Sequence, residues 1–260
     1  MLSTGRRNVM IEKVALVTGA AAGIGAGCAE RLARDRVAIG VLDLDEARCL
    51  RTVANIEAAG GTAIALGADI SNRAQVTQAV AKLRDSLGPI TILVNNAAVT
   101  GYVPFLELSD EQWSTVLSVN LTGTFIVTQV VLPDMIARGW GRIINIASSA
   151  AQTGAKHMAH YVSSKGGVVA LTRALAVEFG PRGITANVIP PRFITGTIMS
   201  EHSFANDKQP TAREALAEAG PICREGRPQD VAGAVAWLAS DEAAFVTGQS
   251  ISVNGGRYIS

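Results

Sequence analysis

Short runs of consecutive apolar residues recur along the chain, and longer amphipathic stretches separate them. The apolar runs predict β-strands near Val14–Val17, Val37–Leu42, Ala63–Leu66, Ile92–Val94, Ile143–Ile146, Thr185–Val188 and Ser250–Val253. The stretches between them predict helices, among them Ile24–Arg34, Glu46–Ala59, Arg73–Ser86, Asp110–Arg138, Ala159–Phe179 and Gln229–Ala239. Apolar strands that alternate with helices are typical of a parallel sheet covered on both faces. We therefore expect a doubly wound α/β fold with a seven-stranded parallel sheet.

The chain shows no repeat and no linker, so its 260 residues are expected to form one domain. Residues 1–10 are expected to be an N-terminal extension, and the polar segment at about 197–222 a mobile cover over a binding site. Charged residues make up only 17% of the chain, against about a quarter in typical soluble domains. This low charge predicts apolar surface buried between subunits.

Charge and cysteine content narrow the possible partners and the compartment. The net charge is +1, which gives no reason to expect binding to nucleic acid or to an anionic membrane. The three cysteines cannot all pair and form no CxxC motif, so we expect a reducing, cytoplasmic location and no zinc site. Of the three histidines, His157 and His160 also lack acidic neighbours at metal-ligand spacing, so no metal site is expected. A small molecule is the expected partner.

Glycines gather in the turn that follows the first predicted strand. The segment Thr18-Gly19-Ala20-Ala21-Ala22-Gly23-Ile24-Gly25 runs directly into a helical pattern. Glycines at this place let the backbone turn tightly and approach a pyrophosphate, whose charge the helix N-terminus stabilises. A tight strand-to-helix turn without a ligand is the alternative reading.

Asp43 ends the second predicted strand, 18 positions after Gly25. A carboxylate there can accept hydrogen bonds from ribose hydroxyls and repels a 2′-phosphate, which favours NAD over NADP. Asp43 could instead cap the following helix, a role that Asp45 serves equally well. Asp69, after the third strand, and Asn96, after the fourth, lie at the carboxyl ends where ligands of such sheets gather, although an Asn pair can also form a turn.

Tyr161 and Lys165 are four residues apart and therefore share one face of a predicted helix. A lysine cation near a phenol favours the phenolate, so Tyr161 could pass a proton to or from a substrate oxygen. Ser148 ends a strand at the same edge of the sheet, and Asn120 lies in a helical stretch where asparagine is a poor choice without a polar role. An ordinary pair of surface residues is the alternative for Tyr161 and Lys165 alone.

The order of these motifs, TGxxxGIG, an acidic strand end, NNA, Asn, Ser, YxxxK and a proline turn, resembles the short-chain dehydrogenase/reductase family from about Lys13 to Gly256. The resemblance implies a Rossmann fold in which Ser148 holds the substrate oxygen and Tyr161 is the general acid/base. It also implies that Lys165 lowers the pKa of the tyrosine and binds the nicotinamide ribose, while Asn120 supports a proton-relay water.

The resemblance further implies a set of cofactor contacts and an assembly. The expected NAD contacts are Gly19, Ala22, Gly23, Ile24, Gly25, Asp43, Leu44, Asp69, Ile70, Asn96, Ala97, Tyr161, Lys165, Pro191, Ile194 and Thr195. The family is commonly tetrameric, and the interface segments would fall within Leu121–Arg138, Ala159–Phe179 and Gln229–Val253. A homotetramer is therefore expected.

Three positions depart from the family pattern. Ala98 replaces the glycine of NNAG, and Arg192 replaces the glycine that follows the proline of the turn. Arg192 either points to solvent or binds a substrate carboxylate or a cofactor phosphate. The family threonine falls on Gly196, so either Thr195 or Thr197 is expected to contact the nicotinamide.

The leading hypothesis is an NAD-dependent dehydrogenase or reductase for a secondary alcohol/ketone pair. The alternatives are a 3-oxoacyl-thioester reductase and, from another class, a protein that senses the dinucleotide without turnover. His157 and His160 are predicted to be solvated residues at a helix start rather than pocket residues.

Overall fold

The computed structural model describes residues 13–197 and 220–259. All sheet pairings are parallel, in the order β3-β2-β1-β4-β5-β6. The strands are β1 (Val14–Thr18), β2 (Ala38–Asp43), β3 (Ala63–Gly67), β4 (Ile92–Asn95), β5 (Gly141–Ile146) and β6 (Ile184–Ile189). The strand order reverses direction between β1 and β4, and such a switch point opens a crevice for a ligand at the carboxyl ends of the strands. The predicted doubly wound α/β fold is confirmed.

The prediction of a seventh strand is wrong in detail, because the described part of the chain forms a sheet of six strands. The segment around Ser250 does run parallel to β6, and the Ile251 N–H donates to the Val188 carbonyl at 2.9 Å. It meets β6 only through isolated bridges, at Val188–Ser250 and Pro191–Val253. Pro190 and Pro191 follow β6 and have no N–H to donate, so they cannot continue a regular ladder.

Several of the helices begin at capping residues in the sequence. They are α1 (Gly23–Arg34), α2 (Glu46–Ala58), α3 (Arg73–Leu87), α4 (Asp110–Leu117), α5 (Thr124–Arg138), α6 (Ala150–Thr153), α7 (Ala159–Phe179) and α10 (Pro228–Leu238). Asp45 caps α2, Asn72 caps α3, and Ser109 forms a capping box with Gln112 at α4. Since Asp45 takes the capping role, the carboxylate of Asp43 remains available for another contact.

The single helix predicted for Asp110–Arg138 is interrupted. A six-residue π-helical segment, Ser118–Gly123, separates α4 from α5 and contains Asn120. The hydroxyl of Thr124, the first residue of α5, donates to the Asn120 carbonyl at 2.8 Å. Short π-helical insertions occur often at functional sites, and this one moves the Asn120 side chain away from the regular helical register.

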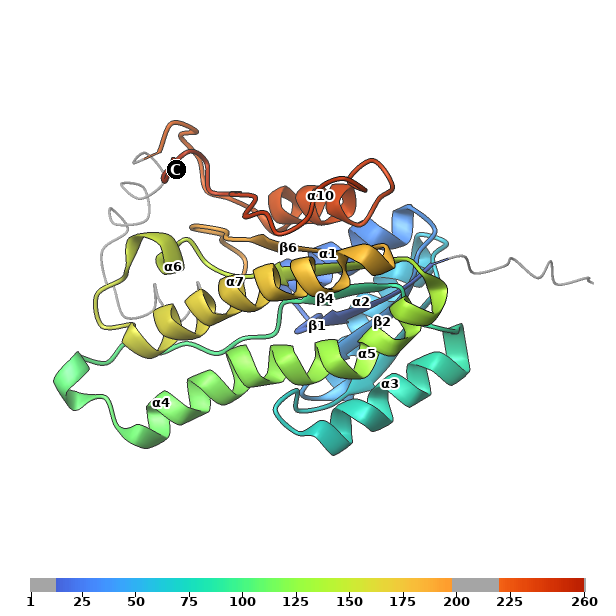
Figure 1. Cartoon of the computed structure of the whole chain (residues 1–260), viewed down its shortest axis with the longest axis horizontal. Helices are drawn as coiled ribbons and strands as arrows, with labels where there is room; N and C mark the ends of the chain where they lie inside the picture. The colour runs from blue at the N-terminus through green and yellow to red at the C-terminus, as the bar shows by residue number, and fades with distance from the viewer. Residues whose placement is uncertain (1–12, 198–219, 260) are drawn as a thin grey trace, which may run out of the picture.

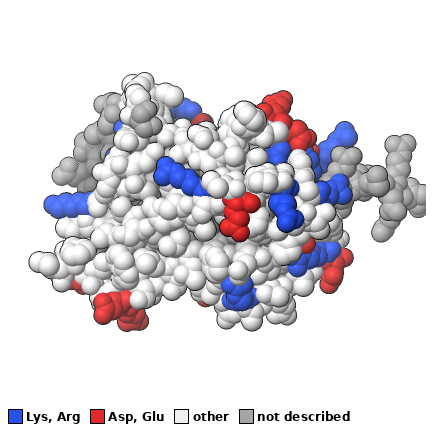
Figure 2. Space-filling model, in the orientation of Figure 1, with Lys and Arg blue, Asp and Glu red and all other residues white. Residues whose placement is uncertain are grey.

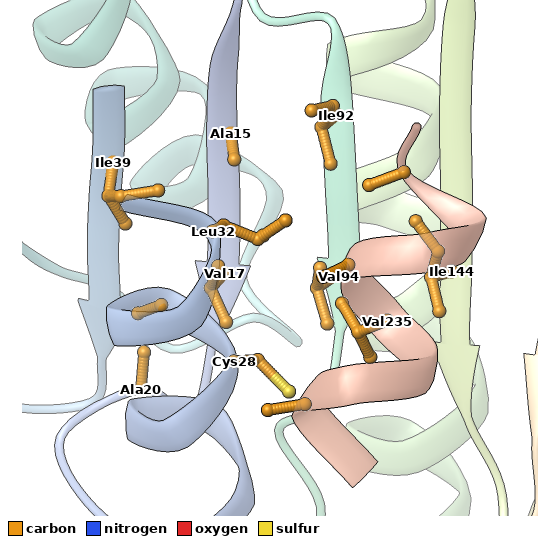
Figure 3. Packing of buried hydrophobic residues seen from close by; sticks show 14 of the residues in the cluster. Ala15, Val17, Ala20, Cys28, Leu32, Ile39, Ile92, Val94, Ile144 and Val235 are labelled. Atoms are coloured by element: carbon orange, nitrogen blue, oxygen red, sulfur yellow. The ribbon is translucent and has the colours of Figure 1, made fainter. Parts of the chain in front are cut away.

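Helices cover both faces of the sheet (Figure 1). On one face α1, α2 and α10 pack in a cluster that includes Leu32, Cys28 and Val235 (Figure 3). On the other face α3, α5 and α7 pack in a second cluster that includes Val80, Val127 and Ala176, from these helices in turn. The two clusters bury both faces of the strands, which explains why the strands are mostly apolar.

A chain of buried amides and hydroxyls fixes α5 and α7 against the sheet. The Asn95 amide donates to the Thr128 hydroxyl at 3.0 Å and to the Asn145 side-chain oxygen at 2.9 Å. The Asn145 amide donates in turn to the Thr172 hydroxyl at 2.8 Å. Buried polar groups of this kind specify one arrangement, because any shift leaves a donor without a partner. The network therefore sets the position of α7, which carries Tyr161 and Lys165.

The helical stretch Asp110–Arg138 is the one described segment that is long and apolar enough to cross a membrane, by length and composition only. Half of its most apolar window is buried inside the protein. Val127, Val131 and Met135 of this stretch are fully buried, so these side chains serve the core.

Candidate active site

The glycine turn is joined directly to the end of β4. The Thr18 hydroxyl accepts from the backbone N–H groups of Asn96 and Ala97 at 3.0 and 3.1 Å. The Asn96 amide donates to the carbonyls of Thr18 and Gly19, both at 3.0 Å. Sequence reasoning singled out Asn96 and Ala97 but missed Thr18, which connects the two strands at the switch point. The only available signal for it was a hydroxyl residue directly before Gly19.

The glycine turn has the geometry that a diphosphate needs. Gly19 and Gly23 have φ values of +63° and +59°, which favour glycine, and a Cβ on Gly25 would overlap the Gly19 carbonyl oxygen. At the N-terminus of α1 the cap residue is Ala22, whose side chain offers no acceptor, and the first turn carries no acidic residue. The N–H groups there are thus open to an external anion, so these residues fit the diphosphate of a dinucleotide.

The Asp43 carboxylate faces this turn. One of its oxygens accepts from the Ala21 N–H at 3.2 Å, and the other accepts from the Leu44 N–H at 2.9 Å. Leu44 itself is largely exposed. Asp69 turns instead to Ser71, whose N–H and hydroxyl donate to it at 2.8 and 2.7 Å. The side chain of Ile70 lies in the second core cluster, against the glycine of the π-helical segment.

Ser148, Tyr161 and Lys165 come together at the carboxyl end of β5. Tyr161 and Lys165 are buried one turn apart on α7, and the Ser148 side chain hydrogen-bonds to the Tyr161 side chain. The Ser148 oxygen also accepts from the Ala150 N–H at 3.1 Å, at the start of α6. The structure therefore places a hydroxyl pair at the edge of the sheet where the glycine turn also lies.

The electrostatics of Tyr161 differ from the sequence expectation. Burial raises the pKa of the phenol to about 12, and the hydrogen bond from Ser148 opposes that rise only in part. Burial also lowers the pKa of Lys165 to about 8. The Lys165 ammonium donates to the Ile146 carbonyl at 2.7 Å and lies 6.0 Å from the centre of the Tyr161 ring. The expected lowering of the tyrosine pKa by Lys165 is thus absent in this structure, because the lysine is turned toward the backbone of β5.

Asn120 acts as a connector between three elements. Its side-chain oxygen accepts from the Val99 N–H at 2.8 Å, and its amide donates to the Val99 carbonyl at 2.9 Å and the Ser164 hydroxyl at 3.0 Å. Both amide hydrogens are therefore used within the protein. The side chain fixes the loop after β4 and the start of α7, rather than presenting a free group to the reaction.

The chain is similar to known proteins over most of its length. Residues 19–257 match the family model described as enoyl-(acyl carrier protein) reductase. The chain is 35% identical to the 2-(S)-hydroxypropyl-CoM dehydrogenase 3 of Xanthobacter autotrophicus, over 96% of this chain and 98% of that protein. The chain belongs to the short-chain dehydrogenase/reductase family. As a member of that family it is an oxidoreductase whose cofactor is a nicotinamide dinucleotide.

One further relative and one solved structure are also similar to this short-chain dehydrogenase/reductase over nearly its whole length. One is the 3-oxoacyl-[acyl-carrier-protein] reductase of Synechocystis, at 38% identity over 94% of this chain and 96% of that protein. Among solved structures, a variant of actinorhodin polyketide ketoreductase with NADPH superposes with a TM-score of 0.89. It is 38% identical, and the match covers 94% of this chain and 97% of that one.

The turn after β6 contains Arg192 and Gly196, two of the three positions at which the sequence analysis noted a departure from the family pattern. The Pro191 carbonyl accepts from the Ser149 N–H at 3.0 Å, which brings the turn beside Ser148. Thr195 donates to the Gly226 carbonyl through its N–H at 3.0 Å and its hydroxyl at 3.3 Å, and the side chain of Thr197 lies against Gly23. Ile194, between them, is buried. Residues 1–12 and 198–219, and with them nearly all of the predicted extension and cover, lie outside the described residues.

Buried polar atoms on the loop after β4, on α6 and on α7 lack partners among the described residues. They are the Thr100 hydroxyl, the Gln152 side-chain oxygen and Nδ1 of His160. His160 is buried, and burial lowers the pKa of its imidazole, so the expectation of a solvated histidine is wrong for His160. It holds for His157, which is exposed. Within the described residues, no three His, Cys, Asp or Glu side chains are placed to hold a metal ion.

Proposed function

We propose that this protein is an NAD(H)-dependent dehydrogenase/reductase that interconverts a secondary alcohol and a ketone. The observation that carries the proposal is the hydrogen-bonded pair of Ser148 and Tyr161, which lies at the same sheet edge as the glycine turn. Ser148 would hold the substrate oxygen, and Tyr161 would exchange a proton with it. The nicotinamide, when bound, supplies or accepts the hydride.

The protonation state of Tyr161 favours one proton-transfer role in the free protein. With a pKa near 12, the phenol keeps its proton at neutral pH, so it is ready to donate that proton to a ketone oxygen. Oxidation of an alcohol needs the phenolate instead. Lys165 would assist by turning its ammonium from the Ile146 carbonyl toward the nicotinamide ribose and the phenol.

The preference for NAD rests on Asp43. Its carboxylate faces the glycine turn and is not consumed as a helix cap, so it can accept hydrogen bonds from the adenosine ribose and repel a 2′-phosphate. Comparing kcat/KM for NADH and NADPH with one ketone tests this assignment. Equal or better use of NADPH would remove the Asp43 argument.

A 3-oxoacyl-thioester reductase is the second candidate. It is supported by the 38% identity to the acyl-carrier-protein reductase of Synechocystis over nearly the whole chain. Following nicotinamide absorbance with simple ketones, sugar alcohols and 3-oxoacyl thioesters separates the two candidates. A kcat/KM for the thioester at least ten-fold above that of every simple ketone would favour the second, since ten-fold corresponds to about 1.4 kcal/mol of transition-state binding.

We also propose a homotetramer. The face of the molecule that carries α5 and α7 has few charged side chains (Figure 2), and Phe125 and Val177 on these helices are exposed. Trp237 and Phe245 are exposed on and after α10. Exposed apolar side chains on two separate faces fit two kinds of subunit contact. Sedimentation that gives only monomer at micromolar concentration would contradict this proposal.

A further inference from the structure

Two arginines lie at the carboxyl end of β6, on segments that are 65 positions apart in the sequence. Arg192 follows Pro191 directly, and its N–H donates to the Val253 carbonyl at 3.4 Å. Arg257 comes from the C-terminal segment, and its guanidinium carbon lies 4.8 Å from the centre of the Phe193 ring. The bridge between Pro191 and Val253 therefore brings the two side chains to the same place.

Neither guanidinium has a carboxylate partner among the described residues, whereas Arg84, Arg142 and Arg224 each form an ion pair. Nη2 of Arg257 is buried and has no hydrogen-bond partner among the residues that the structure describes. Together with burial, the nearby Arg192 lowers the pKa of Arg257, so the two cations repel one another. Two neighbouring cations with an unused buried donor are costly without an anion.

The pair borders the catalytic serine. Arg192 donates to the Thr153 hydroxyl at 3.4 Å, and Thr153 ends α6, the short helix that begins two residues after Ser148. The Ser149 N–H donates to the carbonyl of Pro191, the residue before Arg192, at 3.0 Å. At about 1.5 Å of rise per helical residue, the four steps from the cap residue Ser149 to Thr153 span roughly 6 Å. A substrate that is bound at Ser148 could thus extend one end to the arginines.

We propose that Arg192 and Arg257 bind an oxyanionic group on the substrate, a carboxylate in its simplest form, at the end remote from the reacting carbon. A guanidinium offers parallel N–H donors that match a carboxylate, and Arg257 has such a donor free. This inference rests on the proposed function, and it names the substrate class of that same site. A cofactor phosphate is the competing occupant, and the experiment separates the two.

The test uses a series of methyl ketones that carry a terminal carboxylate, from 3-oxobutanoate to 6-oxoheptanoate, and their uncharged methyl esters. With NADH, the wild type should reduce at least one acid with a kcat/KM at least ten-fold above its ester. Arg192→Gln and Arg257→Gln should each lower kcat/KM for that acid by about ten- to one-hundred-fold, mainly through KM, as loss of a charge-assisted hydrogen bond predicts. The ester should change by less than about two-fold.

Three further variants and measurements control this test. Arg257→Lys keeps the charge and the side-chain stem, so it should fold and lose less than Arg257→Gln. Arg182→Gln removes an equal charge at the opposite, amino-terminal end of β6 and should change neither substrate. Binding of each oxo acid to the protein with NAD⁺ present, measured by calorimetry, does not depend on turnover.

The outcomes are distinct. Binding of an acid that both Gln variants weaken supports the inference even if no ketone is reduced, and in that case only the proposed function fails. The inference is overturned if acid and ester bind and react alike in the wild type. It is also overturned if the Gln variants weaken NADH binding ten-fold and slow both substrates equally, since the arginines would then hold the cofactor.

Discussion

In the cofactor-free protein, burying the charge of Lys165 lowers the free energy of unfolding, and the variant Lys165→Met measures by how much. Burial lowers the pKa of the lysine from its ordinary 10.5 to about 8. Below pH 8 both the folded and the unfolded protein carry the charge, and the folded form bears the full cost of desolvating it. The pKa difference of about 2.5, at about 1.4 kcal/mol for each pH unit, places that cost at about 3 kcal/mol.

Methionine keeps the shape of the side chain but removes both the charge and the hydrogen bond to the Ile146 carbonyl. Leaving that buried carbonyl without a donor costs about 1–2 kcal/mol. The variant should therefore be more stable than the wild type by about 1–2 kcal/mol at pH 7. Between pH 8 and 10.5 the folded wild type loses the charge while the unfolded chain keeps it, so the wild type gains stability as pH rises. Near pH 10 the variant should be the less stable protein.

Urea unfolding of the cofactor-free protein, followed by circular dichroism from pH 6 to 10 at one protein concentration, measures this crossover. Lys156→Met is the matched control, because Lys156 is exposed and its loss should change the free energy of unfolding by less than about 0.5 kcal/mol at every pH. The reasoning is refuted if Lys165→Met is destabilising at pH 7, or if its effect does not change between pH 7 and pH 10.

Three other predictions follow from the site. Gly25→Ala should weaken NADH binding at least ten-fold or prevent folding, because its Cβ overlaps the Gly19 carbonyl. Gly233→Ala, with open space around the new Cβ, should leave the free energy of unfolding unchanged or raise it by about 1 kcal/mol. Fluorescence titration with NADH and urea unfolding compare the two variants. Asn120→Ala should cost about 2–4 kcal/mol of unfolding free energy by leaving the Val99 peptide groups unpaired, and a loss below 1 kcal/mol would contradict the connector role. Because the pKa of Tyr161 is near 12, kcat/KM for alcohol oxidation should rise about ten-fold per pH unit from pH 6 toward 8, whereas a flat profile would show that the phenolate is not the base.

The fold was predictable because each strand carries a run of mostly apolar residues and the residues that cap the helices lie next to them in the sequence. The continuous run at Val14–Val17, for example, needs helices on both faces, and the structure provides them. The end of the sheet was less predictable. Whether Ser250 completes a seventh strand depends on hydrogen bonds to β6, and the prolines after β6 remove the donors that such a strand needs.

The candidate site was predictable in its residue types but not in its electrostatics. Spacing alone places Tyr161 and Lys165 on one helix face, and the structure agrees. That Lys165 donates to the Ile146 carbonyl depends on the packing of α7 against β5, and no short-range pattern reports that packing. The same reason applies to the pairing of Arg192 with Arg257, whose segments meet only through the fold.

Tyr161→Phe tests the central claim most directly. Phenylalanine keeps the ring in its buried place and removes only the hydroxyl that hydrogen-bonds to Ser148. With the best ketone of the panel, the variant should bind NADH as tightly as the wild type and lose at least about a hundred-fold in kcat, as general acid catalysis predicts. Unchanged NADH binding together with more than about a tenth of the wild-type turnover would contradict the assignment of Tyr161 as the proton donor.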